Sequence, residues 1–267
     1  MKRSAPRRTG RQAATRRYSA PALQKGIEII ELLAQVPGGL TISDIALRLK
    51  RSMNEVFRIV VVMEAHGWLR KDPETDLYSV TYQLLELVVR ATPAKSLSVV
   101  AAPIMERLCI ATNQSCHLVV RASGRGLIIL RQENAGLTGG FAVRPGATVD
   151  LVTTCSGHVL LAFASPHQLA DTLEQVPRPM AWPMTKIQRM LSRVRRDGYD
   201  LQKSLRTAGV TDISYPIWGF DGSLVAALTV PYLFRIDDSA PTTLEQTRHL
   251  LADTTRKISI GLGWTPR

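Results

Sequence analysis

Residues 21–67 form three short amphipathic segments separated by tight breaks, and no other part of the chain restricts the fold as strongly. The first segment begins at Pro21, since proline is tolerated in the first turn of a helix. Residues 37–39, Pro-Gly-Gly, end it. Between these points apolar residues recur at helical spacing, which predicts one buried face made of Leu23, Ile27, Ile30 and Ala34.

The second and third segments carry helix-start signals of their own. Thr41 with Asp44 is typical of an N-cap, and Ser52 with Glu55 has the spacing of a full capping box. A tight break at residues 50–51 separates the two. The predicted buried stripes consist of Ile42, Ile45, Ala46 and Leu49 in the second helix, and of Val56, Ile59, Val60 and Met63 in the third.

The third segment has a polar face opposite its apolar one. Asn54, Glu55 and Arg58 lie on that face, and Arg51 comes just before it. A short helix, a tight turn and a polar-faced helix form the geometry that lays one helix in the major groove of DNA. Arg can pair with guanine, Asn with adenine, and Glu can accept from the cytosine amino group. The pattern favours a helix-turn-helix over the alternative, a generic three-helix bundle with solvated polar faces.

A two-stranded wing is predicted after the third helix. Gly67 ends the helix, and strand-like residues 68–71 and 77–80 flank a turn at residues 72–76. Arg70 and Lys71 would then lie where a wing meets phosphates. The predicted DNA-binding residues are Thr41, Arg51, Ser52, Asn54, Glu55, Arg58, Arg70 and Lys71.

The formal net charge of +12 is concentrated at the start of the chain, where residues 1–20 hold seven Lys or Arg and no acidic residue. Such a tail suits DNA, RNA or an acidic membrane surface, and a solvated disordered end is an equal alternative. Nothing resembles a secretory signal or a membrane span. We expect a soluble, cytoplasmic protein with no membrane partner.

The cysteines and one histidine give little indication of chemistry. Cys109, Cys116 and Cys155 lack metal-ligand spacing, so neither a metal site nor a disulfide framework is expected, and no cofactor motif is present. A redox sensor would require two of the thiols to meet in space. His117, alone on a predicted strand, is interpreted as a satisfied core residue rather than a ligand.

The rest of the chain mixes helices and strands without regular β-α-β alternation, which favours an α+β domain with an antiparallel sheet. A linker helix is predicted over residues 81–90. Further helices are predicted at 97–112, 156–164, 185–197 and 242–262, and strands at 115–121, 127–132, 209–218 and 223–232. Residues 124–126 and 221–222 are typical of hairpin turns.

These blocks together resemble the IclR family (isocitrate lyase regulator type) of bacterial transcription factors. The front of the chain contributes residues 22–29 (ALQKGIEI), 37–46 (PGGLTISDIA), 51–58 (RSMNEVFR) and 63–72 (MEAHGWLRKD). The back contributes residues 102–108 (APIMERL), 155–162 (CSGHVLLA), 198–199, 209–210, 213–216 and 226–230. The resemblance covers about residues 20–264. It implies a winged helix-turn-helix, a linker helix and a GAF-like effector domain.

The resemblance also implies a site for a small organic acid or aromatic metabolite at one edge of the sheet. The implied contact residues are Cys155, Ser156, Gln202, Asp212, Thr229 and Pro231. A helix beginning at Cys155 would offer free N–H groups to a carboxylate, and the alternative is that Ser156 only caps that helix. Asp212 stands where relatives often have cysteine and would repel an anion unless protonated or paired. Pro231 has no N–H to donate.

The expected organisation is a disordered basic tail (1–19), a DNA-binding domain (20–80), a linker helix (81–95) and an effector-binding and oligomerisation domain (96–267). The predicted function is a metabolite-controlled transcriptional regulator, with repression slightly favoured, that binds double-stranded operator DNA as a homodimer or homotetramer. It is expected not to be an enzyme. The alternatives are an enzyme built on the back domain and a tail-driven, nonspecific nucleic-acid-binding protein.

Overall fold

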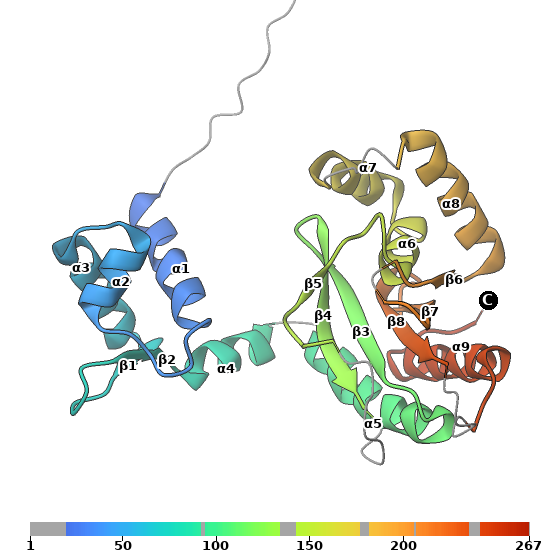
Figure 1. Cartoon of the computed structure of the whole chain (residues 1–267), viewed down its shortest axis with the longest axis horizontal. Coiled ribbons are helices and arrows are strands. Elements are labelled where there is room, and N and C mark those ends of the chain that lie inside the picture. The colour runs from blue at the N-terminus through green and yellow to red at the C-terminus, as the bar shows by residue number, and fades with distance from the viewer. Residues whose placement is uncertain are drawn as a thin grey trace, which may run out of the picture. The chain divides into compact units, whose positions relative to one another are not determined.

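The computed structural model describes residues 20–91, 94–133, 143–176, 182–205, 207–234 and 241–266. The chain divides into two compact units, Met1–Thr92 and Pro93–Arg267 (Figure 1). The predicted basic tail, residues 1–19, lies outside the described residues, and the four-part division drawn from the sequence stays a prediction. No helix within the described ranges is long and apolar enough to cross a membrane.

The first unit is a winged helix-turn-helix, as predicted. Its described elements are the helices α1 (Pro21–Leu33), α2 (Ile42–Leu49), α3 (Met53–Ala65) and α4 (Tyr82–Ala91) and the strands β1 (Leu69–Lys71) and β2 (Tyr78–Val80). The two strands pair antiparallel. Tyr78 also forms a bridge with Leu40, which ties the wing to the segment before α2.

Local capping sets the ends of α2 and α3. The Thr41 hydroxyl accepts from the backbone N–H of Asp44 at 3.2 Å, and the Ser52 hydroxyl accepts from that of Glu55 at 3.3 Å. Lys50 ends α2 with a φ of 53°, in the left-handed region. The full capping box predicted at Ser52 is wrong in one half, since the Glu55 side chain pairs with Lys25 instead of returning to the helix start.

Helix α1 buries a different face from the one predicted. Ile29 and Leu33 lie in the core of the first unit, whereas Leu23 is 65% exposed and Ile27 is 48% exposed. The prediction is wrong at those two positions and at Ala34, which is also exposed, and Ile30 is half-buried. Apolar residues occupy more than one face of α1, so their spacing alone could not select the face that meets α3.

The second unit is built on an antiparallel sheet of six strands in the described part of the chain, in the order β5-β4-β3-β8-β7-β6. Its strands are β3 (Cys116–Ala122), β4 (Arg125–Gln132), β5 (Thr148–Val149), β6 (Asp200–Lys203), β7 (Val210–Trp218) and β8 (Leu224–Leu233). Its helices are α5 (Ala94–Thr112), α6 (Cys155–Ala162), α7 (Pro166–Gln175), α8 (Met184–Asp197) and α9 (Leu244–Gly261). The predicted α+β class and antiparallel sheet are confirmed.

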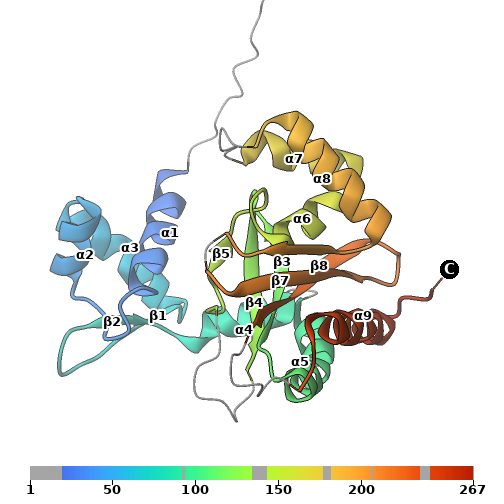
Figure 2. The ribbon, with the colours of Figure 1, turned by 45° about the vertical axis from the view of Figure 1, so that its right-hand side comes forward.

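Helices cover both faces of this sheet (Figure 2). Leu118 and Leu228 belong to a core shared with α5 and α9 on one face. Val119 and Ala227, the next residue on β3 and the preceding one on β8, belong to a second core shared with α6 and α8. The alternation of strand side chains therefore divides the buried residues into two layers.

Four features of the second unit were not predicted, one of them the two-residue strand β5. Helix α7 was missed although Ser165 and Gln168 form a complete capping box at its start. The short strand β6 was missed because four residues carry too little pattern. The β3–β4 turn consists of Ser123 and Gly124, with φ values of 43° and 73°, rather than residues 124–126.

Helix α6 approaches the preceding loop so closely that only glycine fits at position 157. A Cβ there would lie 2.4 Å from the Leu151 Cα and 2.5 Å from its carbonyl oxygen. We predict that Gly157→Ala lowers the free energy of unfolding by about 1–3 kcal/mol, since backbone atoms must move. Urea unfolding followed by circular dichroism measures this. Ser192→Ala, at an exposed position of α8, serves as the control and should change stability by less than about 0.5 kcal/mol. Equal stability of both variants would contradict the prediction and show that the Leu151 backbone moves away from position 157 at little cost.

Candidate DNA-binding face and effector site

The outer face of α3 is partly polar and partly apolar. Val56, Val60 and Met63 are buried, and Asn54 and Arg58 are exposed, as predicted. Four apolar side chains are also exposed on this helix: Met53 at 57%, Phe57 at 52%, Val61 at 41% and Val62 at 56%. Phe57 was not among the predicted contact residues, because those predicted on α3 were polar side chains only.

Two of the predicted DNA-binding side chains are tied to α1. Glu55 forms an ion pair with Lys25, and the hydrogen bond from Lys25 holds the pKa of the Glu55 carboxyl below its usual value. The Arg51 guanidinium lies 3.1 Å from the Glu28 carboxylate. Neither pairing was predictable from local pattern, because the partners are 30 and 23 residues apart along the chain.

Asn54 and Arg58 form no ion pair with α1 among the described residues. The Arg58 Nε donates to the Asn54 carbonyl at 3.4 Å, which is the one hydrogen bond of its side chain among the described residues. Thr41 and Ser52 both serve as caps. In the wing Arg70 is exposed, and Lys71 lies 2.6 Å from Asp76, whose carboxylate raises the pKa of Lys71. Asn54 and Arg58 are thus the candidates on α3 most available to an external partner.

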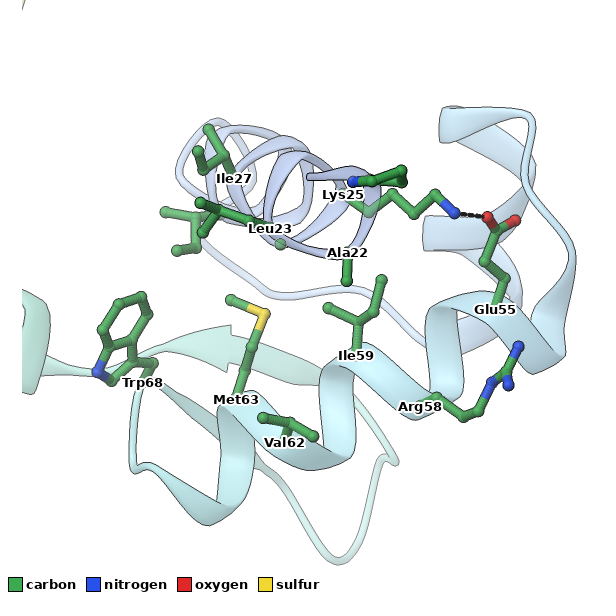
Figure 3. Close-up of a pocket in the computed structure, with 13 residues that line it drawn as sticks. Ala22, Leu23, Lys25, Ile27, Glu55, Arg58, Ile59, Val62, Met63 and Trp68 are labelled. Atoms are coloured by element: carbon green, nitrogen blue, oxygen red, sulfur yellow. Dashed lines mark ion pairs between the residues drawn. The ribbon is translucent and has the colours of Figure 1, made fainter. Parts of the chain in front are cut away.

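A groove of about 770 Å³ lies between α1 and α3 (Figure 3). Its Lys25–Glu55 ion pair lies at one end, and Ile27 and Trp68 lie toward the other. Its lining is mostly apolar and consists of Pro21, Ala22, Leu23, Lys25, Gly26, Ile27, Ile30, Glu55, Arg58, Ile59, Val62, Met63 and Trp68. The exposed side chains of α1 that the sequence placed in the core therefore belong to an open apolar surface.

In the second unit, the candidate effector residues gather where α6 meets the sheet. The buried Cys155 Sγ lies 3.1 Å from the Asp200 carbonyl oxygen and 3.4 Å from that of Asp212. Burial raises the pKa of this thiol well above its usual value. Cys155 is therefore a neutral thiol that donates to the backbone of β6 and β7.

The start of α6 is capped by a residue that the sequence reasoning did not name. Thr154 is the N-cap, and its hydroxyl accepts from the Gly157 N–H at 3.2 Å. The alternative that Ser156 caps the helix is wrong, since Ser156 lies inside the first turn and is 3% exposed. The Gln202 side chain donates to the Thr153 carbonyl at 3.4 Å, so it contacts this same loop.

Strand register brings the other candidates together. Gln202, Asp212 and Pro231 are opposite one another across β6, β7 and β8. Thr229 is opposite Ser214, and their hydroxyl oxygens are 2.9 Å apart. Burial raises the pKa of Asp212 to about 6. All six residues implied by the resemblance thus lie on α6 or the three strands β6, β7 and β8.

A buried charged network supports this corner of the unit. His158 Nδ1 is 2.7 Å from the Asp200 carboxylate, and its Nε2 is 2.7 Å from the Val152 carbonyl oxygen. Arg193 of α8 forms an ion pair with the same carboxylate. Each ring nitrogen is thus within hydrogen-bond distance of an oxygen atom, one on β6 and one in the loop before α6. His158 therefore fixes the loop before α6 to β6, rather than activating Cys155, which lies three residues away.

The remaining cysteines contact each other. The Sγ atoms of Cys109 and Cys116 are 3.4 Å apart, and both side chains are buried. Two thiols thus meet in space, as a redox sensor would require, and any such role stays untested. Among the described residues no group of three or more His, Cys, Asp or Glu side chains could hold a metal ion.

The two units match two family models in the order seen along the chain. Residues 22–73 match the IclR helix-turn-helix domain, and residues 90–260 match the bacterial transcriptional regulator IclR C-terminal domain. A DNA-binding front unit and a sheet domain behind it define a two-part bacterial transcriptional regulator. The chain belongs to the IclR family of these regulators.

Similar proteins support the same assignment over the whole chain. The HTH-type transcriptional repressor AllR of Klebsiella pneumoniae is 23% identical over 265 residues, covering 97% of this chain and 96% of that one. The HTH-type transcriptional regulator BhcR of Paracoccus denitrificans is 28% identical, covering 98% and 94%. The structure of an IclR homolog from Microbacterium hydrocarbonoxydans complexed with 4-hydroxybenzoate has a TM-score of 0.74 at 25% identity, covering 90% of this chain and 98% of that one.

The raised pKa of Asp212 predicts a pH-dependent stability. Because the folded state keeps this proton up to about pH 6 and the unfolded state releases it near pH 4, stability falls as pH rises between these values. Above pH 6 the free energy of unfolding of Asp212→Asn should therefore exceed that of wild type by up to about 2–3 kcal/mol. Urea unfolding at pH 4, 6 and 8 measures the difference.

Asp221→Asn provides the matched control. Hydrogen bonds from Ser223 hold the pKa of the Asp221 carboxyl below its usual value, so its loss should give no gain at high pH. A parallel pH profile for wild type and Asp212→Asn would contradict the assignment.

Proposed function

We propose that this regulator is a repressor that binds operator DNA through α3 and is controlled by a small organic acid or aromatic metabolite bound beside α6. The observation that carries the proposal is the outer face of α3, where Asn54 and Arg58 are exposed and free of ion pairs with α1. Repression is supported by AllR, which is named a transcriptional repressor.

On this proposal, Arg58 forms a fork to a guanine and Asn54 binds an adenine. The exposed Phe57 adds an apolar contact suited to a thymine methyl group. Arg70 and Lys71 contact phosphates, which position the helix without specifying bases. Glu55 and Arg51 do not contact DNA but position α3 through their ion pairs with α1.

A second copy of the chain is the proposed occupant of the groove between α1 and α3. One helix-turn-helix contacts half a site, so operator binding requires paired heads. A large apolar surface with Leu23 and Ile27 exposed marks an interaction site, and a twofold interface uses the same patch on both copies. We propose a homodimer formed through this groove, with a homotetramer as the larger assembly.

The effector site proposed here consists of Ser156, Gln202, Asp212 and Thr229, with Cys155 and Pro231 contributing shape rather than hydrogen bonds. The ligand 4-hydroxybenzoate of the Microbacterium hydrocarbonoxydans structure supports a compact aromatic acid. We further propose that the protein acts in the cytoplasm and has no catalytic activity of its own. The neutral Cys155 thiol, directed at backbone carbonyls, supports this last point.

The experiment that tests the function is a footprint of the full-length protein on the DNA upstream of its own gene, repeated with a panel of aromatic and aliphatic acids. A protected operator that one acid releases is the expected result. Protection that no compound changes would leave a regulator without the proposed effector, and turnover of any panel compound would support the enzyme alternative.

Arg58→Ala tests base recognition. We predict a loss of about 1–3 kcal/mol of discrimination at one operator base pair, while binding to random DNA is nearly unchanged. Arg70→Ala should instead weaken binding to all sequences alike and lower the slope of log K against log salt by about 0.9. Affinities for an operator library, measured at several salt concentrations, separate the two. An unaltered sequence preference in Arg58→Ala would remove it from the base-contacting surface.

Ile27→Asp tests the groove. A carboxylate buried in a dimer interface is costly, so this variant should be monomeric at micromolar concentration, where wild type sediments as a dimer or tetramer. Leu47→Asp is the matched control, since Leu47 is 78% exposed on α2 and does not line the groove. Sedimentation velocity measures both. A monomeric wild type, or an Ile27→Asp variant that still pairs, would place the interface elsewhere.

A further inference from the structure

A row of polar side chains crosses the sheet of the second unit. Residues that are opposite each other in antiparallel strands point to the same face. The row consists of Arg131 on β4, His117 on β3, Thr229 on β8, Ser214 on β7 and Asp200 on β6. Val119 and Ala227, each two residues from a member of the row, pack in the core shared with α6 and α8. The row therefore faces α6, on the same side as Asp212 and Cys155.

Every member of this row except His117 has a partner. Arg131 binds Glu133 and the Val143 carbonyl, and Asp200 binds His158 and Arg193. Thr229 and Ser214 bond to each other. These side chains are thus satisfied within the chain.

His117 is buried without such a partner. It is 7% exposed, and neither of its ring nitrogens has a hydrogen-bond partner among the described residues. Burial lowers its pKa to about 4, so the free protein holds it neutral at pH 7. Buried polar side chains are nearly always hydrogen-bonded, and an exception calls for a ligand or water. His117 is therefore a core residue, as interpreted, but it is not a satisfied one.

We propose that His117 binds the carboxylate of the effector, next to Thr229, and that it takes up a proton as the acid binds. The inference rests on the proposed effector-controlled function and names the residue that recognises the acid group. A ring N–H donates to a carboxylate oxygen, and the hydroxyl of Thr229 is its neighbour in the row. Arg131 lies opposite His117 on β4, with its charge balanced by Glu133, so the hydrogen bonds to the acid group come from His117 and Thr229.

The proton that His117 takes up comes from the solvent. The titratable groups on the same side of the sheet are Arg131 on the neighbouring strand β4, Asp212 on β7, and Asp200 on β6 with its partner His158 on α6. A bound carboxylate stabilises the imidazolium and so raises the pKa of His117 above about 4. The complex therefore holds a proton that the free protein lacks. Binding of the acid should weaken as pH rises through the pKa of the complex.

The anion also acts on Asp212, whose pKa is already raised to about 6. A nearby carboxylate raises it further, so part of any proton uptake belongs to Asp212. Substitutions at both positions are needed to assign the proton. Asp212→Asn should keep the uptake that belongs to His117.

The test is isothermal titration of the full-length protein at pH 6.5 in buffers of different ionisation enthalpy, which gives affinity and proton uptake together. The probes are 4-hydroxybenzoate, benzoate, glycolate and pyruvate, with 4-hydroxybenzamide as the uncharged match. We expect His117→Leu to lose about 10- to 100-fold in affinity for the acid that binds wild type, the size expected for a hydrogen bond to a charged group. Its affinity for the amide should change less than about threefold.

His117→Asn separates recognition from packing. It can donate a hydrogen bond but cannot titrate, so it should recover part of the affinity and none of the proton uptake. His167→Asn, at an exposed position on α7, is the control and should match wild type. Thermal unfolding shows that each variant is folded.

The outcomes separate this inference from the function on which it rests. An acid that binds His117→Leu as tightly as wild type, with equal proton uptake, overturns the role of His117 and leaves the effector function standing. Binding of the amide alone overturns the acid class. If no probe binds a protein that still protects its operator, the proposed effector function fails and this inference fails with it.

Discussion

The second unit depends on one buried carboxylate. Asp200 is buried at the edge of the sheet, where an unpaired charge would be very costly. It is stabilised by His158 from α6 and by Arg193 from α8, so one side chain joins a strand to two helices. His158 in turn holds the Val152 carbonyl in the loop before α6. Removing Asp200 would take the shared partner from both His158 and Arg193, so this one carboxylate positions the three elements as a unit.

This anchoring explains why the candidate effector residues converge although they are distant in the sequence. The start of α6 is fixed against β6 and β7, where the Cys155 thiol contacts the backbone of both strands. In the row of polar side chains that faces α6, His117 is the member without a hydrogen-bond partner among the described residues. A rigid scaffold with one unsatisfied histidine differs from a flexible pocket, because binding then requires little reordering of the protein.

The sequence predicted features that depend on neighbouring residues and missed those that depend on distant ones. The caps at Thr41 and Ser52 and the hairpin at residues 221–222 were predictable because each motif satisfies its own backbone groups. The buried face of α1 was not, since either of two apolar faces could meet α3. Glu55 was assigned to a capping box from its spacing to Ser52. Its actual partner, Lys25, lies in another helix and is not visible in that local spacing. The effector residues came from family resemblance, and local pattern alone would not have joined Gln202 to Thr229.

His117 shows why a binding residue is hard to recognise from sequence. The side chains of β3 point alternately into two cores, so the sequence predicts that a histidine on this strand is simply buried. Among the described residues, only the missing hydrogen-bond partner distinguishes His117 from an ordinary core residue. That absence is a property of the folded surroundings. A satisfied histidine such as His158 stabilises the scaffold in every state, whereas an unsatisfied one contributes its hydrogen bond only when a ligand is present. The free energy of the hydrogen bond at His117 is therefore gained only in the bound state. A ligand-controlled regulator requires such a difference between its bound and free states.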